Sequence, residues 1–211
     1  MVSRPVIGIV SVAAIAAVAF YVIDPSSSAD SADQPANAHF RTMDSAQLTA
    51  EAARGVYEAL AADMRTRYGE ADIPHASAYQ QWTRFSSAPY RSASHGQRYV
   101  SNYGNELAAD YPQVLDGVAM PPGAVLAKDA FAATTDGDVY AQSLFLMEKL
   151  APGASPQTGD WRYVMITPAG EVYGDTTGAE PANVTFCHTC HAAQAHTDYL
   201  FYIPEAFRAA R

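Results

Sequence analysis

The segment FCHTCH, Phe186–His191, contains the only two cysteines of the 211-residue chain, Cys187 and Cys190. Cys-x-x-Cys followed directly by His is the attachment signature of a c-type haem. The two intervening residues hold the thiols at the spacing of the two porphyrin vinyl groups, and the next residue, His191, is carried under the iron. The motif therefore predicts one covalent haem c, attached through Cys187 and Cys190, with His191 as the iron ligand.

Two alternatives compete with haem for these residues. A disulfide or a thioredoxin-like redox pair does not require the following His, and its Cys-x-x-Cys usually opens a helix in a βαβ unit, for which the sequence gives no pattern. A zinc site could combine Cys187, Cys190 and His191 with His188 or His196, since Cys₂His₂ sets bind zinc tetrahedrally. His188, however, lies between the cysteines and is badly aimed for such a site.

The motif lies near the C-terminus, which bears on the sixth iron ligand. Electron-transfer cytochromes with Met/His ligation place a methionine far downstream of the motif, but none of the twenty residues after His191 is Met. Methionine upstream falls on helix and strand patterns, where it is typical of core packing; these residues are Met43, Met64, Met120, Met147 and Met165. The sequence therefore predicts an iron with an open distal position for small ligands.

The N-terminal segment indicates export. Pro5–Ile23 is uncharged and follows Arg4, and its length is that of a bilayer-spanning helix of roughly 17 to 25 residues. Small residues at Ser27 and Ala29 would also allow signal cleavage before Asp30. We expect a membrane-anchor or signal helix at residues 1–24, a flexible linker at 25–40 and a haem domain at 41–211, on the periplasmic side of the inner membrane.

Composition excludes some function classes and indicates a fold class. The 22 acidic residues exceed the 13 basic ones, and a net charge of −9 would repel a nucleic-acid backbone. The 13 Pro, 13 Gly, 13 Tyr and 8 Phe suit strands and turns better than a helical bundle such as that of the four-helix cytochromes c-prime.

Hydrophobic periodicity predicts the elements of the haem domain. Apolar residues every four positions predict an amphipathic helix over Asp44–Tyr68, and a weaker helical pattern covers Ser77–Phe85. Strands are predicted at Arg98–Tyr103, Ala124–Ala130, Val139–Leu150 and Trp161–Thr167, with turns at Met120–Gly123, Asp136–Gly137 and Pro168–Gly170. The predicted fold is α+β, a mainly antiparallel β-sheet domain with flanking helices.

Five segments occur in a familiar order around the haem motif: HGQRYVSNYGNELA (95–108), MPPGAVLAKDAF (120–131), LFLMEKLAPG (144–153), DWRYVMITPAGEV (160–172) and CHTCH with HTDYLFYIP (196–204). In order and spacing they resemble the cytochrome P-460 and cytochrome c-prime-beta family from about Trp82 onward. The resemblance implies an antiparallel β domain, usually a homodimer, with one haem c and a five-coordinate iron. It also implies hydroxylamine oxidation in the P-460 branch, where a lysine is bonded to the porphyrin, and NO binding in the other.

The resemblance points to further site residues. Lys128 in VLAKDAF best matches the lysine that is bonded to haem, and in a strand it would share a face with Leu126. Arg98 is a candidate distal donor to a bound ligand. Glu148 or Asp129 is a candidate general base, because hydroxylamine oxidation releases protons.

Two function classes remain open at this point. One is a haem oxidoreductase or NO-handling protein that acts on small nitrogen species. The other is an electron-transfer cytochrome or haem subunit, tethered to a membrane by its anchor and linker so that it meets a redox partner at high local concentration.

Overall fold

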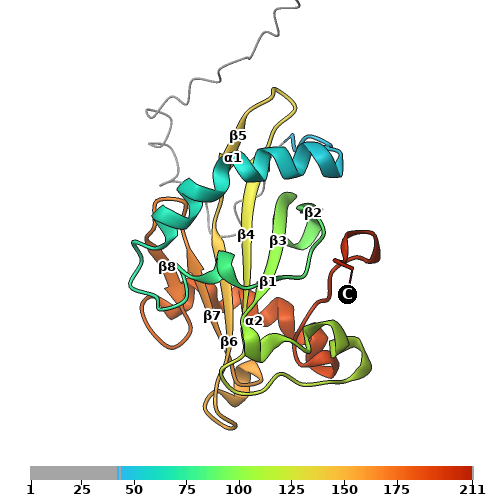
Figure 1. The fold of residues 1–211 in the computed structure, drawn as a ribbon. Coiled ribbons are helices and arrows are strands. Elements are labelled where there is room, and N and C mark those ends of the chain that lie inside the picture. The colour runs from blue at the N-terminus through green and yellow to red at the C-terminus, as the bar shows by residue number, and fades with distance from the viewer. Residues whose placement is uncertain (1–41, 43, 211) are drawn as a thin grey trace, which may run out of the picture. The chain divides into compact units, whose positions relative to one another are not determined.

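The computed structural model describes residue 42 and residues 44–210. The predicted leader (1–24) and linker (25–40) lie outside the described residues. Within the described part of the chain, no helix is both long and apolar enough to cross a bilayer. This part forms an eight-stranded antiparallel sheet with two α-helices and several short 3₁₀ turns (Figure 1).

The strands are short at the sheet edges and long in its middle. Their bounds are β1 Thr83–Arg84, β2 Tyr90–Ser92, β3 Arg98–Gly104, β4 Val125–Ala133, β5 Val139–Ala141, β6 Leu144–Lys149, β7 Trp161–Ile166 and β8 Val172–Asp175. The order across the sheet is β1-β3-β4-β6-β7-β8, while β2 pairs with β3 and β5 with β4. The prediction of a mainly antiparallel α+β domain is therefore confirmed for the described residues.

The predicted strand Val139–Leu150 is two strands, because one extra residue interrupts it. Phe131 of β4 pairs with Ala141 of β5, whereas Lys128 pairs with Phe145 of β6. From Phe131 to Lys128 the chain moves by three residues on β4, while from Ala141 to Phe145 it moves by four on the partner. One extra residue on the partner is the geometry of a β-bulge. The bulge decides which face of the sheet the β6 side chains occupy.

The helix predicted from Asp44 begins six residues later, as α1 Ala50–Tyr68 with Thr49 as its N-cap. Its predicted first turn is drawn into the sheet edge instead: Ser45 bridges Thr134, and the Ala46 amide donates to the Ala133 carbonyl over 2.8 Å. Backbone pairing with an open strand end therefore outweighs the helical pattern there.

The helix predicted at Ser77–Phe85 is also wrong. This segment forms a 3₁₀ turn, Tyr79–Gln81, followed by β1, which pairs with β3. A single turn satisfies fewer backbone groups than the ladder does, so the chain continues as a strand.

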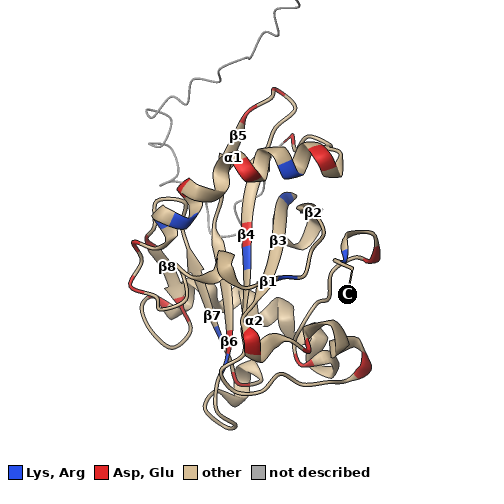
Figure 2. Cartoon of the chain, in the orientation of Figure 1, with Lys and Arg blue, Asp and Glu red and all other residues tan. Residues whose placement is uncertain are grey.

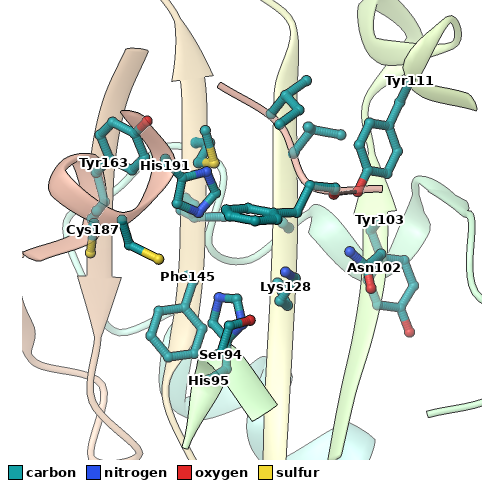
Figure 3. A pocket seen from close by; sticks show the side chains of 18 of the residues that line it. Ser94, His95, Asn102, Tyr103, Tyr111, Lys128, Phe145, Tyr163, Cys187 and His191 are labelled. Carbon is teal, nitrogen blue, oxygen red and sulfur yellow. Dashed lines mark hydrogen bonds between the residues drawn. The ribbon is translucent and has the colours of Figure 1, made fainter. Parts of the chain in front are cut away.

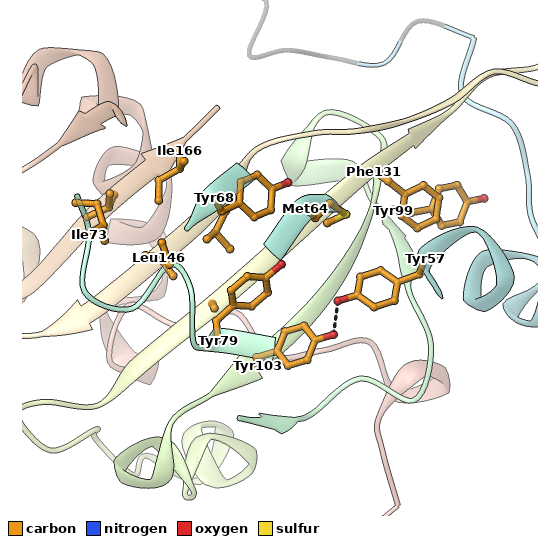
Figure 4. Close-up of a cluster of buried hydrophobic side chains, with 14 of the residues drawn as sticks. Tyr57, Met64, Tyr68, Ile73, Tyr79, Tyr99, Tyr103, Phe131, Leu146 and Ile166 are labelled. Atoms are coloured by element: carbon orange, nitrogen blue, oxygen red, sulfur yellow. Dashed lines mark hydrogen bonds between the residues drawn. The ribbon is translucent and has the colours of Figure 1, made fainter. Parts of the chain in front are cut away.

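Two separate cores lie on the two faces of the sheet. One face packs against α1 through a cluster rich in tyrosine that includes Tyr57, Tyr68, Tyr79 and Tyr103 (Figure 4). The other face packs against the C-terminal segment, which carries the second helix, α2 Thr185–His191. Lys128 and Asp129 are adjacent on β4, so their side chains enter opposite environments. Figure 2 shows a basic position next to an acidic one on this strand.

Candidate haem-binding site

The cysteine motif forms most of α2. Cys187, Cys190 and His191 stand at helix positions i, i+3 and i+4, so all three side chains share one face. That face lines a pocket on the sheet, and the two thiols are not bonded to each other. Burial raises the pKa of the Cys187 thiol to about 12, so this thiol is protonated at neutral pH.

The orientation of His191 is fixed by the chain that follows it. Its Nδ1 lies 2.6 Å from the carbonyl oxygen of Tyr199. A carbonyl can only accept, so Nδ1 carries the proton and the lone pair is on Nε2. Tyr199 and its neighbour Asp198 both have positive φ, 63° and 54°, which turns the chain back beneath the helix. This is the second-sphere contact that an iron-ligating imidazole requires.

The pocket encloses about 820 Å³ of empty space, part of it open to solvent. Apolar and aromatic side chains dominate its lining, and polar side chains such as His95, Lys128 and Asn102 stand among them (Figure 3). The apolar side chains on this face are Leu126, Phe145, Met147, Leu200 and Phe201, together with the ring of Tyr163. Leu146 and Val164 also border the pocket but belong to the cluster on the α1 face.

Two histidines enter this pocket at different levels. The His191 ring packs edge-on against Tyr163, 5.4 Å between centroids, and the His95 ring packs in the same manner against Phe145 at 5.2 Å. Tyr163 pairs across the sheet with Met147, which is two residues from Phe145 on β6. The two imidazoles therefore rest on rows of the sheet about 7 Å apart.

The register also locates the pocket methionine. Met147 pairs with Tyr163, which places it in the row of His191 and not in the row of His95. Among the described residues that line the pocket, it is the only thioether. Met64, Met120 and Met165 are buried, as predicted for packing residues, and Met43 lies outside the described residues.

His95 was not predicted as a site residue, although the sequence shows its signal: a His-Gly pair directly before a strand. It ends the 3₁₀ turn Ala93–His95, and Gly96, at φ 71°, returns the chain into β3. Its Nδ1 lies 3.0 Å from the Ser92 hydroxyl and 3.2 Å from the Ser94 hydroxyl. Burial, followed by the positive charge of Lys128, lowers the pKa of His95 well below its usual range, so the imidazole is neutral at pH 7.

Lys128 lines the same pocket, between Asn102 and Phe145 across the sheet (Figure 3). It shares this face with Leu126, as strand alternation predicts. Burial lowers the pKa of its amine to about 8. At pH 7 the amine is then neutral in roughly a tenth of the molecules, which makes it far more nucleophilic than the amine of a solvated lysine.

The remaining predicted residues lie elsewhere. Glu148 is outside the pocket lining and forms an ion pair with Arg162 over 3.0 Å. Asp129 is fully buried on the α1 face, where it accepts hydrogen bonds from Tyr57 and Tyr79. Neither carboxylate is placed to act as a distal base.

Arg98 is also absent from the pocket lining. It is almost fully buried at the start of β3, and burial lowers its pKa to about 10, which leaves it charged at pH 7. Its charge also contributes, after burial and Lys128, to the lowered pKa of His95.

The residues present fit a haem. An apolar cavity adjoins two thiols on one helix face, and the Nδ1 hydrogen bond of His191 leaves Nε2 unprotonated, as an iron ligand must be. The zinc alternative requires a group of at least three His, Cys, Asp or Glu side chains arranged around one point, and no such group occurs among the described residues. The fold and the pocket together define a haem-binding cytochrome.

Comparison with known families agrees with this class. Residues 76–202, more than half of the chain, match the family model of cytochrome P460. The chain therefore belongs to the cytochrome P460 family, which implies a haem cofactor. A search of curated protein sequences found no match.

Proposed function

We propose that this chain is an exported mono-haem c cytochrome whose iron keeps an open distal position and binds or oxidises small nitrogen species such as NO and hydroxylamine. The observation that carries the proposal is that Cys187, Cys190 and His191 share one face of α2 and reach one pocket. Met147, the only thioether among the described residues that line this pocket, lies on the same side as His191. A haem bound there supplies an iron that takes a small ligand and exchanges single electrons.

The chain's own residues have separate tasks in this proposal. Cys187 and Cys190 hold the cofactor covalently, and the Tyr199 carbonyl orients His191. The apolar lining limits the access of water to the reacting ligand. Lys128 lines the pocket, and its partly neutral amine would lie against the edge of a bound porphyrin, where the hydroxylamine-oxidising branch carries its lysine bond.

Denaturing extraction of the purified protein tests covalent attachment. We expect the haem colour to stay with the polypeptide in the wild type and to be extracted from the double variant Cys187→Ala/Cys190→Ala. Colour that leaves the wild-type chain, or zinc in place of iron, contradicts the proposal. Peptide mass spectrometry then separates the branches: a third bond, at Lys128, indicates the oxidase type, and two thioethers alone indicate the NO-binding type.

The leader suggests where the protein works. The uncharged segment Pro5–Ile23 supports a location on the periplasmic side of the inner membrane, where a redox partner protein and a second copy of the chain are further expected partners. Fractionation of cells that express the full chain tests this location. Haem-containing protein in the cytoplasm contradicts it.

A further inference from the structure

The wall of the pocket opposite His191 carries a polar side chain, His95, to which the sequence analysis assigned no role. His95 stands in the row of Phe145, about 7 Å along the sheet from the row on which His191 packs. Figure 3 shows the two imidazoles on opposite sides of the space, with Cys187 at its margin. A haem held by Cys187, Cys190 and His191 would have His95 on the side of the pocket away from His191.

The local structure also limits how His95 can turn. Nδ1 is within hydrogen-bond distance of both the Ser92 and the Ser94 hydroxyl, at 3.0 and 3.2 Å. Phe145 packs against the ring, so rotation of the imidazole would break both kinds of contact. Serine hydroxyls donate as well as accept, so these contacts are compatible with an unprotonated Nδ1 and the imidazole proton on Nε2, which is the tautomer that the inference requires.

From this geometry we infer that His95 is the distal hydrogen-bond donor of the site: its Nε2–H donates to a small ligand on the haem iron, with Ser92 and Ser94 as positioning residues. This inference rests on the proposed function. It assigns to His95 the polar distal role for which Arg98, Glu148 and Asp129 were candidates, and all three of those residues lie outside the pocket lining. One donor serves both NO and hydroxylamine, since each presents an electron-rich atom to the distal side.

The carbon monoxide complex of the ferrous holoprotein tests the inference by infrared spectroscopy. A donor near bound CO lowers the C–O stretching frequency, so we expect His95→Phe to raise it. CO dissociation should become faster, by up to roughly 10-fold for one lost hydrogen bond. His95→Gln keeps an N–H donor and should give an intermediate frequency. His75→Phe makes the same change at a histidine that packs on Trp82 outside the pocket, and should match the wild type.

Ser92→Ala tests the positioning role separately. The loss of one hydroxyl at Nδ1 lets both imidazole tautomers form, so the C–O band should broaden or split while the unliganded spectrum stays the same. A band like that of the wild type would show that Ser92 does not position His95.

Three results would overturn the inference. Equal C–O frequencies in the wild type and His95→Phe mean that no donor acts from this position, while the proposed open site stands. A six-coordinate low-spin wild type that becomes high-spin in His95→Phe makes His95 an iron ligand instead. A wild type with haem that binds neither CO nor NO refutes the open site itself, and the distal donor with it.

Discussion

Lys128 and Lys149 are the only two lysines of the chain, and the fold gives them opposite tasks. Lys128 lies in the haem pocket. Lys149 donates to the Gly159 carbonyl, pairs with Asp198 and lies 4.9 Å from the centre of the Trp161 ring, and so fastens the segment after the haem motif to the sheet. One lysine therefore faces the cofactor while the other is structural.

This contrast gives a matched pair of variants. We expect Lys128→Met to shift the haem absorption bands, because it removes an amine from the porphyrin edge. Lys149→Met removes the same charge outside the pocket, so its bands should shift less than those of Lys128→Met, and the loss of the Asp198 ion pair should lower the thermal midpoint of unfolding. Absorption spectra of the ferric and ferrous proteins check both expectations. Unchanged bands in Lys128→Met would place the amine away from the ring.

The sequence predicted the local parts of the site and missed those that depend on distant contacts. Cys187, Cys190 and His191 follow from a contiguous motif, and strand alternation correctly put Lys128 beside Leu126. The same alternation excludes Asp129 from the face that Lys128 occupies. The placement of Glu148 depends on the bulge between β5 and β6, which no sequence spacing encodes. That of His95 depends on a turn after β2, for which the sequence shows only the His-Gly pair.

At the scale of elements, the connection between β6 and β7 packs against Tyr199, the residue that orients His191. Gly159 lies in this connection at φ 66°, and a Cβ added there would overlap the ring of Tyr199. Tyr199 supplies the carbonyl that holds His191 Nδ1. The β6–β7 connection is therefore coupled to α2 through the ring of Tyr199 and the hydrogen bond between its carbonyl and His191.

Gly159→Ala should perturb His191 indirectly, because the added Cβ displaces Tyr199. The displaced Tyr199 weakens the hydrogen bond to Nδ1, so His191 becomes a weaker donor and the iron–histidine stretching frequency of the ferrous protein falls. Backbone strain and the clash together should destabilise the fold by about 2–4 kcal/mol. Resonance Raman spectroscopy and thermal unfolding measure the two effects.

Gly153→Ala is the control for this variant. Gly153 also has a positive φ, 81°, in the same connection, but an added Cβ meets nothing within 4 Å. It should therefore cost about 1–2 kcal/mol of strain and leave the iron–histidine frequency unchanged. Equal frequencies in both variants would show that Tyr199 does not tune His191.

The element boundaries that the sequence missed share a physical cause. Residues before α1 and those of β1 are in segments with helical periodicity, yet both pair with strands that would otherwise have open backbone groups. The long segments β3, β4 and β7 were predicted within a few residues, because their apolar runs and flanking turns are local signals.

At the scale of the whole described domain, one sheet separates a haem-binding face from a face that is packed with tyrosines. Asp129 is buried in the second face, where the Tyr57 and Tyr79 hydroxyls donate to it over 2.7 and 2.9 Å. Tyr57 also contacts the Tyr103 hydroxyl at 2.6 Å. Burial raises the pKa of Asp129 to about 6, because two neutral donors do not fully replace its hydration.

A carboxyl whose pKa is higher in the folded state makes the domain less stable as the pH rises. The folded form holds the proton up to about pH 6, whereas the unfolded chain releases it near pH 4, so the free energy of unfolding falls between these values. The shift corresponds to about 3 kcal/mol in all. We therefore expect wild type to lose stability relative to Asp129→Asn as the pH rises from 4 to 6.

Denaturant unfolding of the holoprotein at several pH values, followed by circular dichroism, measures this difference. Asp136→Asn, in the exposed turn between β4 and β5, controls for the loss of one negative charge and should stay parallel to the wild type. Parallel curves for Asp129→Asn and the wild type would mean that Asp129 is ionised in the folded protein throughout this range. The tyrosine core would then stabilise a buried carboxylate, and the face opposite the haem would carry a permanent negative charge behind Lys128.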